Sequence, residues 1–353
     1  MASLVIRDLD EHTISRIDQL AKDKNLSRTP GQYFHNLTEM RLLPQKITMK
    51  TRLIQDGVPL HVYNKGYDGN LLFYTIFDYL SFFTALSCLS AKYGVELIAL
   101  TLMPNHYHCL QLGERKAIIK FNQDLASWYA KEFNSVYNID GQLFSTPYGR
   151  APKSIGKQIR ATIAYILNNP CVGGISDSIL EYRWNFIPYY GNPYPFSEAY
   201  AASKASMKMR RAVQHIKRMQ QLNHPLNHAN LRILFSDLTR IEAEQLIDII
   251  IFEYQCVNFK KLSTYFNSDL NRIFELLNTI GGSEHDIKED WERYDCYLKL
   301  IDHLKMLWGN DFERQLFKPG DRTSIETELV RRFRAKPHHL DRIFHKPRFG
   351  CGG

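Results

Sequence analysis

Hydrophobic and polar residues alternate in short segments of the chain and recur at helical spacing in longer segments. The alternation predicts strands at 59–67, 95–103 and 106–112, and the helical spacing predicts helices at 72–92, 118–137 and 154–168. These elements follow one another in the order β, α, β, β, α and a further helix. This order predicts an α+β fold, a ferredoxin-like antiparallel sheet with helices on one face, as a domain covering 56–195.

A smaller unit is predicted before this domain, at 1–48. Residues 2–8 alternate like a strand, and Ser27 is a suitable N-cap for the second of two short helices. The segment resembles the ribbon-helix-helix DNA-binding family in its Leu-Val-Ile-Arg strand and in the Asn-Leu-Ser-Arg start of its second helix. The resemblance implies a homodimer on duplex DNA, with Arg7 at the bases and Arg28 near a phosphate. An N-terminal cap that packs on the next domain is the alternative.

The third predicted part, 200–353, has helical spacing throughout. Near its end the sequence IETELVRRFRAKPHHLDRIF predicts two short helices, which look like a helix-turn-helix within 322–346. On this interpretation Arg342, His345 and Lys346 are available to DNA. Short basic helix pairs are common, so a pair of ordinary surface helices is the alternative.

The charge of the chain favours polyanionic partners. The formal net charge is +8, and Lys and Arg cluster at 204–218 and again at 314–348. Two solvated helix faces would explain the same clusters. Six scattered cysteines without a Cys-x-x-Cys pair argue against a zinc ribbon or a disulfide framework, and they favour a reducing, cytoplasmic setting.

One segment raises the question of a membrane. Residues 71–89 are almost entirely apolar, but Asp78 interrupts them and no similar segment accompanies them. A helix buried against a sheet is the favoured interpretation, so no membrane partner is expected. The first residues also lack the basic and apolar regions of a signal peptide.

Two histidines and a later helix carry the candidate chemistry. His106 and His108 are two residues apart on a predicted strand, so their side chains share a face and can bind one metal ion. Tyr107 and Cys109 should then pack on the opposite face. In the helix at 154–169 the apolar residues fall on one stripe, whereas Tyr165 and Asn169, one turn apart, fall on a polar stripe. We expect an exposed phenol and a metal site where the sheet meets solvent. The alternatives are a structural or zinc-binding histidine pair and a tyrosine at an ordinary surface.

Two motifs extend this interpretation. Leu-Met-Pro-Asn-His-Tyr-His at 102–108 and Tyr-Ile-Leu-Asn-Asn-Pro at 165–170 resemble the single-tyrosine HUH transposases, most closely the REP-associated tyrosine transposases, over about 59–190. The resemblance implies that His106, His108 and Asn169 bind Mg²⁺ or Mn²⁺ and that Tyr165 is the nucleophile. It also implies single-stranded, hairpin-forming DNA as the substrate and a 5′-phosphotyrosine intermediate. The basic residue usual after Asn-Pro is replaced by Cys171, which puts the local DNA contacts in doubt.

The sequence therefore supports a metal-dependent DNA strand transferase, an endonuclease that rejoins what it cuts. A DNA-binding regulator that keeps the fold without cutting is the second hypothesis. A zinc hydrolase that uses His106 and His108 is the third. Trp128 and Trp184 could stack on bases, but packing in the core is the preferred interpretation for both.

Overall fold

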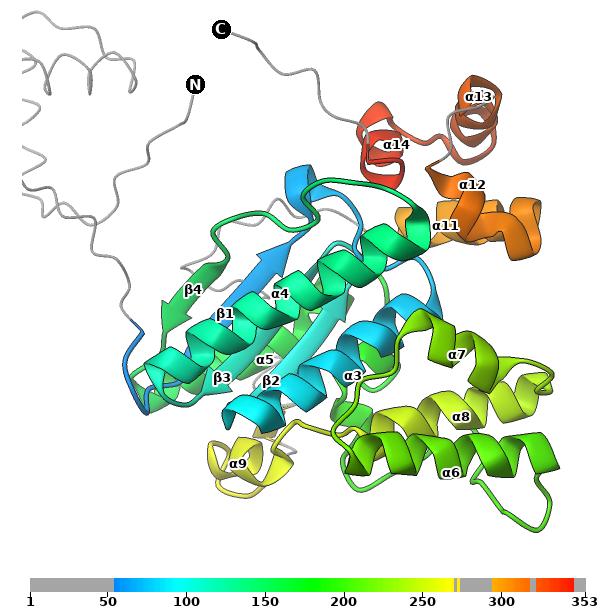
Figure 1. Ribbon diagram of the computed structural model, residues 1–353. Helices are drawn as coiled ribbons and strands as arrows, with labels where there is room; N and C mark the ends of the chain where they lie inside the picture. Colours follow the sequence, from blue (N-terminus) through cyan, green and yellow to red (C-terminus); the bar gives the residue numbers. More distant parts are fainter. Residues whose placement is uncertain (1–53, 270–271, 274–293, 318–321, 346–353) are drawn as a thin grey trace, which may run out of the picture. The chain divides into compact units, whose positions relative to one another are not determined.

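The computed structural model describes residues 54–269, 272–273, 294–317 and 322–345 (Figure 1). The predicted ribbon-helix-helix segment, with Arg7 and Arg28, lies outside the described residues, and so does Lys346. The chain from Ile54 onward belongs to one compact unit.

Four strands form one antiparallel sheet. They are β1 (Leu60–Lys65), β2 (Glu96–Met103), β3 (His106–Leu112) and β4 (Gly149–Pro152), in the order β2-β3-β1-β4. Helix α3 (Ile76–Tyr93) joins β1 to β2, and α4 (Arg115–Tyr137) joins β3 to β4. This β-α-β-β-α-β order confirms the predicted α+β, ferredoxin-like sheet. The prediction missed β4, a four-residue edge strand that ends in proline, where alternation gives little signal.

The alternation of side chains divides the sheet into two faces. Val62 and Tyr107 belong to the core that contains α3 and α4, whereas Leu110 belongs to a second cluster with α5 (Gly156–Val172). The expected helices on one face are therefore α3 and α4, but the opposite face is not open to solvent (Figure 1). Helix α5 packs there, mainly on β2. Both faces of the sheet are thus covered by helices.

Helix α3 is buried on most sides. Its first turn is closed by a capping box in which the Thr75 hydroxyl accepts from the Asp78 amide and Asp78 accepts from the Thr75 amide. The helix ends at Gly94, which has a left-handed φ of 65°. Among the described residues no helix is long and apolar enough to cross a membrane. The apolar segment is instead explained by packing against α4, β2 and two later helices.

After residue 200 the described chain is almost entirely helical, as predicted. Its helices are α6 (Met207–Gln221), α7 (His228–Phe235), α8 (Arg240–Glu253), α9 (Phe259–Thr264), α11 (Asp295–Trp308), α12 (Phe312–Leu316), α13 (Arg322–Phe333) and α14 (Pro337–Ile343). Helices α7 and α8 pack on α3, and α12 packs on α4. The C-terminal helices and the sheet therefore share one hydrophobic core.

The last two helices occur where the sequence predicts them, but their side chains are used inside the fold. His345 donates from Nε2 to the Leu71 carbonyl at 2.9 Å, and its ring stacks on Phe133. Burial lowers the pKa of His345 to about 4, so the ring is neutral at pH 7 and offers no charge to DNA. The expectation that His345 is available to DNA is therefore wrong. Arg342 donates to the Tyr297 hydroxyl at 3.1 Å. Its contact with DNA stays a prediction, and such a contact would compete with this hydrogen bond.

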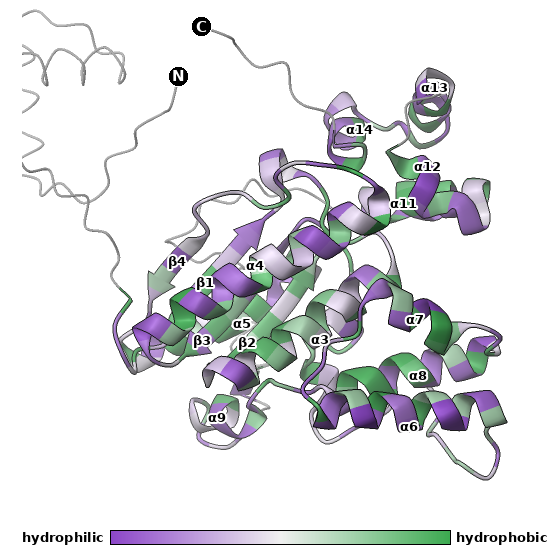
Figure 2. Ribbon diagram, in the orientation of Figure 1, coloured by the Kyte–Doolittle hydropathy of each residue, from purple (hydrophilic) through white to green (hydrophobic). Residues whose placement is uncertain are grey.

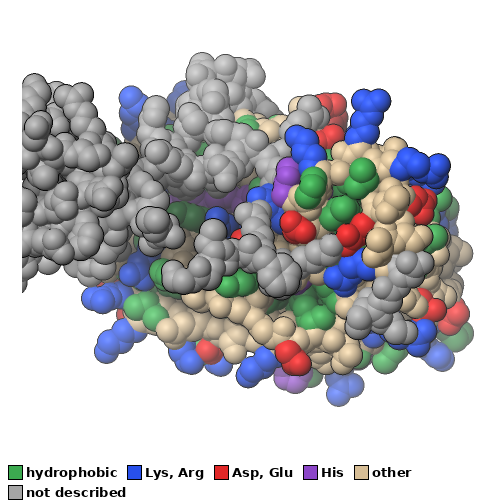
Figure 3. Space-filling model, turned by 90° about the horizontal axis from the view of Figure 1, so that it is seen from above, with side chains coloured by type: hydrophobic (Ala, Val, Ile, Leu, Met, Phe, Trp, Pro, Cys, Tyr) green, Lys and Arg blue, Asp and Glu red, His purple; other side chains and the backbone are tan. Residues whose placement is uncertain are grey.

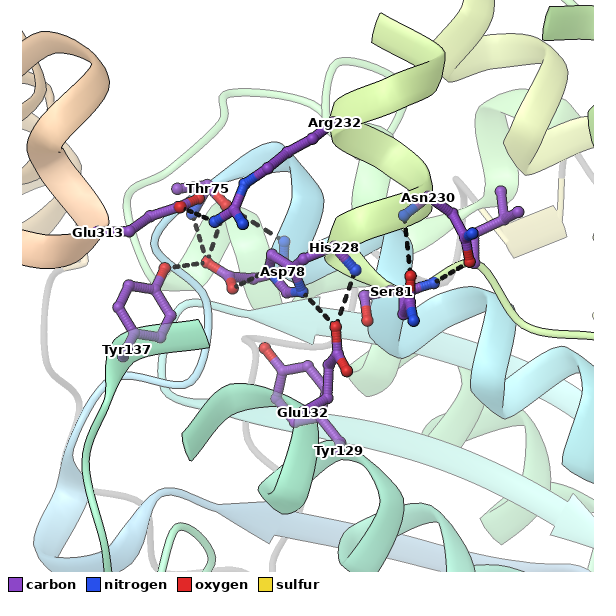
Figure 4. Close-up of polar contacts among 12 residues, drawn as sticks. Thr75, Asp78, Ser81, Tyr129, Glu132, Tyr137, His228, Asn230, Arg232 and Glu313 are labelled. Atoms are coloured by element: carbon purple, nitrogen blue, oxygen red, sulfur yellow. Dashed lines mark hydrogen bonds and ion pairs between the residues drawn. The ribbon is translucent and has the colours of Figure 1, made fainter. Parts of the chain in front are cut away.

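A buried group of charges joins α7 to α3 and α4 (Figure 4). His228 Nε2 lies 2.8 Å from Asp78 Oδ1, and His228 Nδ1 lies 3.1 Å from Glu132 Oε1. Tyr137 also donates to Asp78, at 2.8 Å. Burial alone would lower the pKa of His228, but the hydrogen bonds to Asp78 and Glu132 outweigh it and raise the pKa to about 9. At neutral pH an imidazolium ion therefore lies between two carboxylates.

This ion cluster predicts a pH dependence of stability. The pKa of His228 rises from 6.5 to about 9 on folding, so its charge stabilises the fold in full below about pH 6.5 and loses this effect as the pH passes 9. We expect the melting temperature to fall between pH 7 and about pH 9.5. His228→Gln should lower the free energy of unfolding by about 3 kcal/mol at pH 7 and flatten this fall, because the paired charge is gone.

The control is His215→Gln, since His215 is exposed on α6. It should leave both the melting temperature and its pH dependence unchanged. An equal pH dependence in the wild type and in His228→Gln, measured by thermal unfolding, would contradict the assignment.

Candidate metal and tyrosine site

The alternation of β3 places its two histidines as the sequence predicts. Tyr107 and Cys109 point into the core under α3 and α4, so His106 and His108 point to the face that α5 covers. The two imidazole rings lie 4.9 Å apart, centroid to centroid, at 85° to each other. Both side chains can therefore reach a common point above the sheet.

Helix α5 brings the other two predicted residues to the same place. Asn169 Oδ1 lies 3.2 Å from His106 Nε2, and the Tyr165 ring meets the His108 ring edge-on with centroids 5.3 Å apart. The Thr101 hydroxyl of β2 donates to the Ile166 carbonyl at 2.7 Å, which holds α5 against the sheet. All four predicted site residues are thus side by side.

The site is more buried than predicted. The exposed fractions are 7% for His106, 0% for His108, 4% for Tyr165 and 5% for Asn169. Tyr165 packs in the apolar cluster with Leu110, so the expectation of an exposed phenol at a surface cleft is wrong. The spacing of apolar residues predicted a single buried side of α5. The Tyr165 side of α5 also faces the sheet, where the Tyr165 ring meets the rings of His61 and His108. Tyr294, before α11, lies against His106 with ring centroids 5.5 Å apart.

Two neighbours orient the imidazoles. The Asn105 amide oxygen lies 2.7 Å from His106 Nδ1, and an amide oxygen only accepts, so this nitrogen carries a proton. On β1, the strand beside β3, His61 Nε2 lies 3.0 Å from His108 Nδ1. Metal-bound histidines commonly donate their second ring N–H in this way, which fixes the tautomer and the ring orientation. His61 and Asn105 are therefore positioning residues for the two candidate ligands.

The contact between His106 and Asn169 has a spacing that suits two ligands of one ion. With its proton on Nδ1, a neutral His106 turns the lone pair of Nε2 toward the Asn169 oxygen, so two acceptors face each other at 3.2 Å. A rotated Asn169 amide, a second proton on His106 or a shared metal ion relieves this opposition. Two adjacent ligands of an octahedral ion, each at about 2.1 Å, lie about 3 Å apart. The spacing found here therefore fits a metal-binding pair.

The donor set limits which metals fit. Within the described part of the chain, no three His, Cys, Asp or Glu side chains are placed to hold one ion. A catalytic zinc site normally takes three such ligands, so the zinc hydrolase hypothesis gains no support. Two imidazoles with one amide oxygen form a neutral, nitrogen-rich set. Such a set suits Mn²⁺ better than Mg²⁺, which prefers oxygen.

His61 and its neighbour Tyr63 were not singled out from the sequence. The signal was present, because alternation within β1 puts both on the face opposite Leu60 and Val62, the face that His106 and His108 occupy. The Tyr63 ring lies over Gly149 of β4, where an added Cβ would come within 1.9 Å of the ring. Glycine at this position therefore makes room for the aromatic wall of the site. No comparable pattern in the sequence points to Tyr294.

The two tryptophans belong to the core, as preferred. Trp184 is buried and stacks on Tyr79 at 4.5 Å between centroids, and Trp128 is partly buried against the same core. A cavity of about 460 Å³ lies elsewhere, lined by residues such as Asn70 and Phe317. None of the four site residues lines this cavity, so we attach no site chemistry to it.

A substitution at His61 tests its positioning role. His61→Phe removes the hydrogen bond to His108 and should lower the Mn²⁺ affinity by about 10- to 100-fold, the usual effect of losing such a partner. Titration calorimetry or the EPR signal of unbound Mn²⁺ measures this. His215→Phe, at an exposed position, should leave the affinity unchanged. Equal affinities for the wild type and His61→Phe would count against the role.

Comparisons with known proteins add little to this geometry. No family model matches the sequence, and no curated protein matches it. A solved structure of a REP-associated tyrosine transposase bound to a REP hairpin is 14% identical, with a TM-score of 0.33, and the match covers 44% of this chain and 93% of that chain. A likeness of this size carries no argument about function, which must come from the site itself.

Proposed function

We propose that this chain is a metal-dependent DNA endonuclease and strand transferase with Tyr165 as its nucleophile. One observation carries the proposal. Two imidazoles and an amide oxygen with the spacing of a metal site meet the Tyr165 phenol on one face of the sheet. A metal beside a tyrosine is suited to covalent attack on a phosphodiester. The resemblance of the two sequence motifs points to single-stranded, hairpin-forming DNA as the substrate.

The proposed reaction conserves phosphate ester bonds. The Tyr165 oxygen attacks phosphorus and loses its proton, the bond from phosphorus to the 3′-oxygen breaks, and that oxygen takes up a proton. The products are a 5′-phosphotyrosine and a free 3′-hydroxyl. Attack by a 3′-hydroxyl on the phosphotyrosine restores the phenol, so strands are rejoined without an external energy source.

His106, His108 and Asn169 would hold the ion, while His61 and Asn105 keep the imidazoles turned toward it. When bound, a divalent ion polarises the scissile phosphate and stabilises the charge that develops on its oxygens. Because Tyr165 is buried, substrate binding must move aside side chains that cover the site. Tyr294, against His106, is one of them.

A DNA-binding regulator that does not cut is the second candidate function. The burial of Tyr165 and His108 favours it, since an idle site can stay closed. The two functions differ in one product, a covalent bond between protein and DNA.

Substitution of Tyr165 separates the two functions. The protein is incubated with end-labelled hairpin DNA and Mn²⁺, and products are resolved on a denaturing gel. We expect a covalent adduct with the wild type and none with Tyr165→Phe, because phenylalanine fills the same space without the nucleophile. Tyr190→Phe is the matched control, since Tyr190 is half-exposed and its ring contacts Phe259 rather than any of the four residues, and it should form the adduct as the wild type does.

Three results would decide against the proposal. An adduct that persists in Tyr165→Phe would move the nucleophile elsewhere. Release of labelled fragments without any adduct would indicate hydrolysis. Tight DNA binding with neither product, at every hairpin offered from the flanks of the encoding gene, would favour the regulator.

A further inference from the structure

Helix α6 lies in the longest uniformly basic segment of the described chain. Residues 199–236 contain no Asp or Glu. The same stretch has seven basic side chains, which are Lys204, Lys208, Arg210, Arg211, Lys217, Arg218 and Arg232. The sequence alone left open whether this cluster is a binding surface or a solvated helix face. The structure decides where its charges point.

One side of α6 is buried and the other is cationic. Four apolar residues of α6 are buried where it packs on α8, namely Met209, Ala212, Val213 and Ile216. Arg210, Arg211, Lys217 and Arg218 are all exposed on the other sides. Hydrophilic residues dominate this helix in Figure 2. The polar side is thus held outward by the core contacts on the opposite side.

The exposed cations form two short rows. Residues seven apart differ by only about 20° around a helix and by about 10 Å along it. Arg210 therefore lines up with Lys217, and Arg211 lines up with Arg218. The two rows are about 100° apart around the helix. Four positive groups are thus spread over a rigid, convex surface about 10 Å long.

These charges are mostly not compensated by the protein. Lys217 lies 3.5 Å from Glu253 of α8, but within the described residues no carboxylate pairs with Arg210, Arg211 or Arg218. Glu242 is occupied at the start of α6, where it accepts from the Ser206 amide. The exposed arginines therefore present a net positive surface.

The C-terminal helices show the opposite arrangement. Ion pairs there join Lys299 to Asp295, Arg314 to Asp311 and Arg332 to Glu328. On the face that Figure 3 shows, basic and acidic side chains are interspersed. These ion pairs reduce the net positive charge of the C-terminal helices. On α6, within the described residues, Arg210, Arg211 and Arg218 form an adjacent group without any carboxylate partner.

We propose that the outer face of α6 binds the phosphate backbone of a double-helical DNA stem. The helix carries no Phe, Tyr or Trp, so it lacks the rings on which unpaired bases stack in single-strand sites. Its apolar side is used by α8, so it cannot insert into a lipid surface as an amphipathic helix does. Paired rows of arginine and lysine match the two phosphate strands that border a groove.

Salt dependence of binding tests this surface directly. The protein carries Tyr165→Phe throughout, so binding is measured without cutting, and the probe is a fluorescent hairpin with a fully paired stem. We compare it with a variant that adds Arg210→Gln, Arg211→Gln and Arg218→Gln. Each lost phosphate contact should reduce the slope of log K against log salt by about 0.9, or about 2.7 for the three.

The matched control removes the same charge elsewhere. Lys299→Gln, Arg331→Gln and Arg332→Gln are at exposed positions of α11 and α13 and should leave the slope unchanged. All sites are exposed, so melting temperatures should agree. An equal slope in the α6 variant and its parent would overturn the proposal. It would also fail if the α6 variant lost affinity equally for an unpaired oligonucleotide or for vesicles of anionic lipid.

The DNA chemistry of this surface rests on the proposed function, but the two can fail separately. An adduct at Tyr165 with an unchanged slope in the α6 variant would leave the strand transferase and remove the α6 surface. A reduced slope without any adduct would leave a stem-binding surface on a protein that does not cut.

Discussion

The register of β3 between β1 and β2 is the constraint on which the site depends. A strand alternates its side chains, so a shift of one residue would turn His106 and His108 into the α3 and α4 core and bring Tyr107 out. Such a shift is prevented because Tyr107 is fully buried on one face and Leu110 on the other. Tyr107 and Leu110 therefore hold the histidines against α5. Packing energy, rather than any bond within the site, fixes where the imidazoles lie.

The C-terminal helices are part of this arrangement and not an appendage. Asp78 closes the first turn of α3 and is held by His228 from α7, while the Tyr74 hydroxyl donates to the Ile343 carbonyl at 2.6 Å. The adjoining segment reaches the site, since the Asn105 amide donates to the Gly69 carbonyl at 3.2 Å and its oxygen holds His106. A continuous set of contacts thus runs from α7 and α14 to a candidate metal ligand. Destabilising these helices should therefore disturb the orientation of His106.

The sequence predicted what depends on local pattern and missed what depends on neighbours distant in the chain. Alternation and spacing were enough for three strands, for the helices and for the pairs His106/His108 and Tyr165/Asn169, because each is a property of one element. The meeting of the two pairs was expected from the resemblance of the two motifs. The burial of Tyr165 and the position of Tyr294 against His106 depend on packing between different elements, which the pattern of one element does not show. The alternation of β1 does point to His61, which lies on the face opposite Leu60 and Val62. His345 was misjudged because a basic helix pair looks the same in sequence whether its side chains face solvent or a core.

Charge compensation separates the structural charges of this protein from those that can meet a polyanion. Around His228 the chain supplies both signs, with one imidazolium between Asp78 and Glu132, and the group needs no partner. At the proposed metal site the three ligands are neutral, so a bound divalent ion would keep its full charge. The exposed arginines of α6 likewise have no carboxylate partner within the described chain. In both places a phosphate backbone would provide the negative charge that the protein lacks. The desolvation cost of binding a phosphate is lowest where no protein carboxylate must first be displaced. Both proposals, cutting at the metal site and holding a paired stem on α6, therefore depend on positive charge that the protein leaves uncompensated.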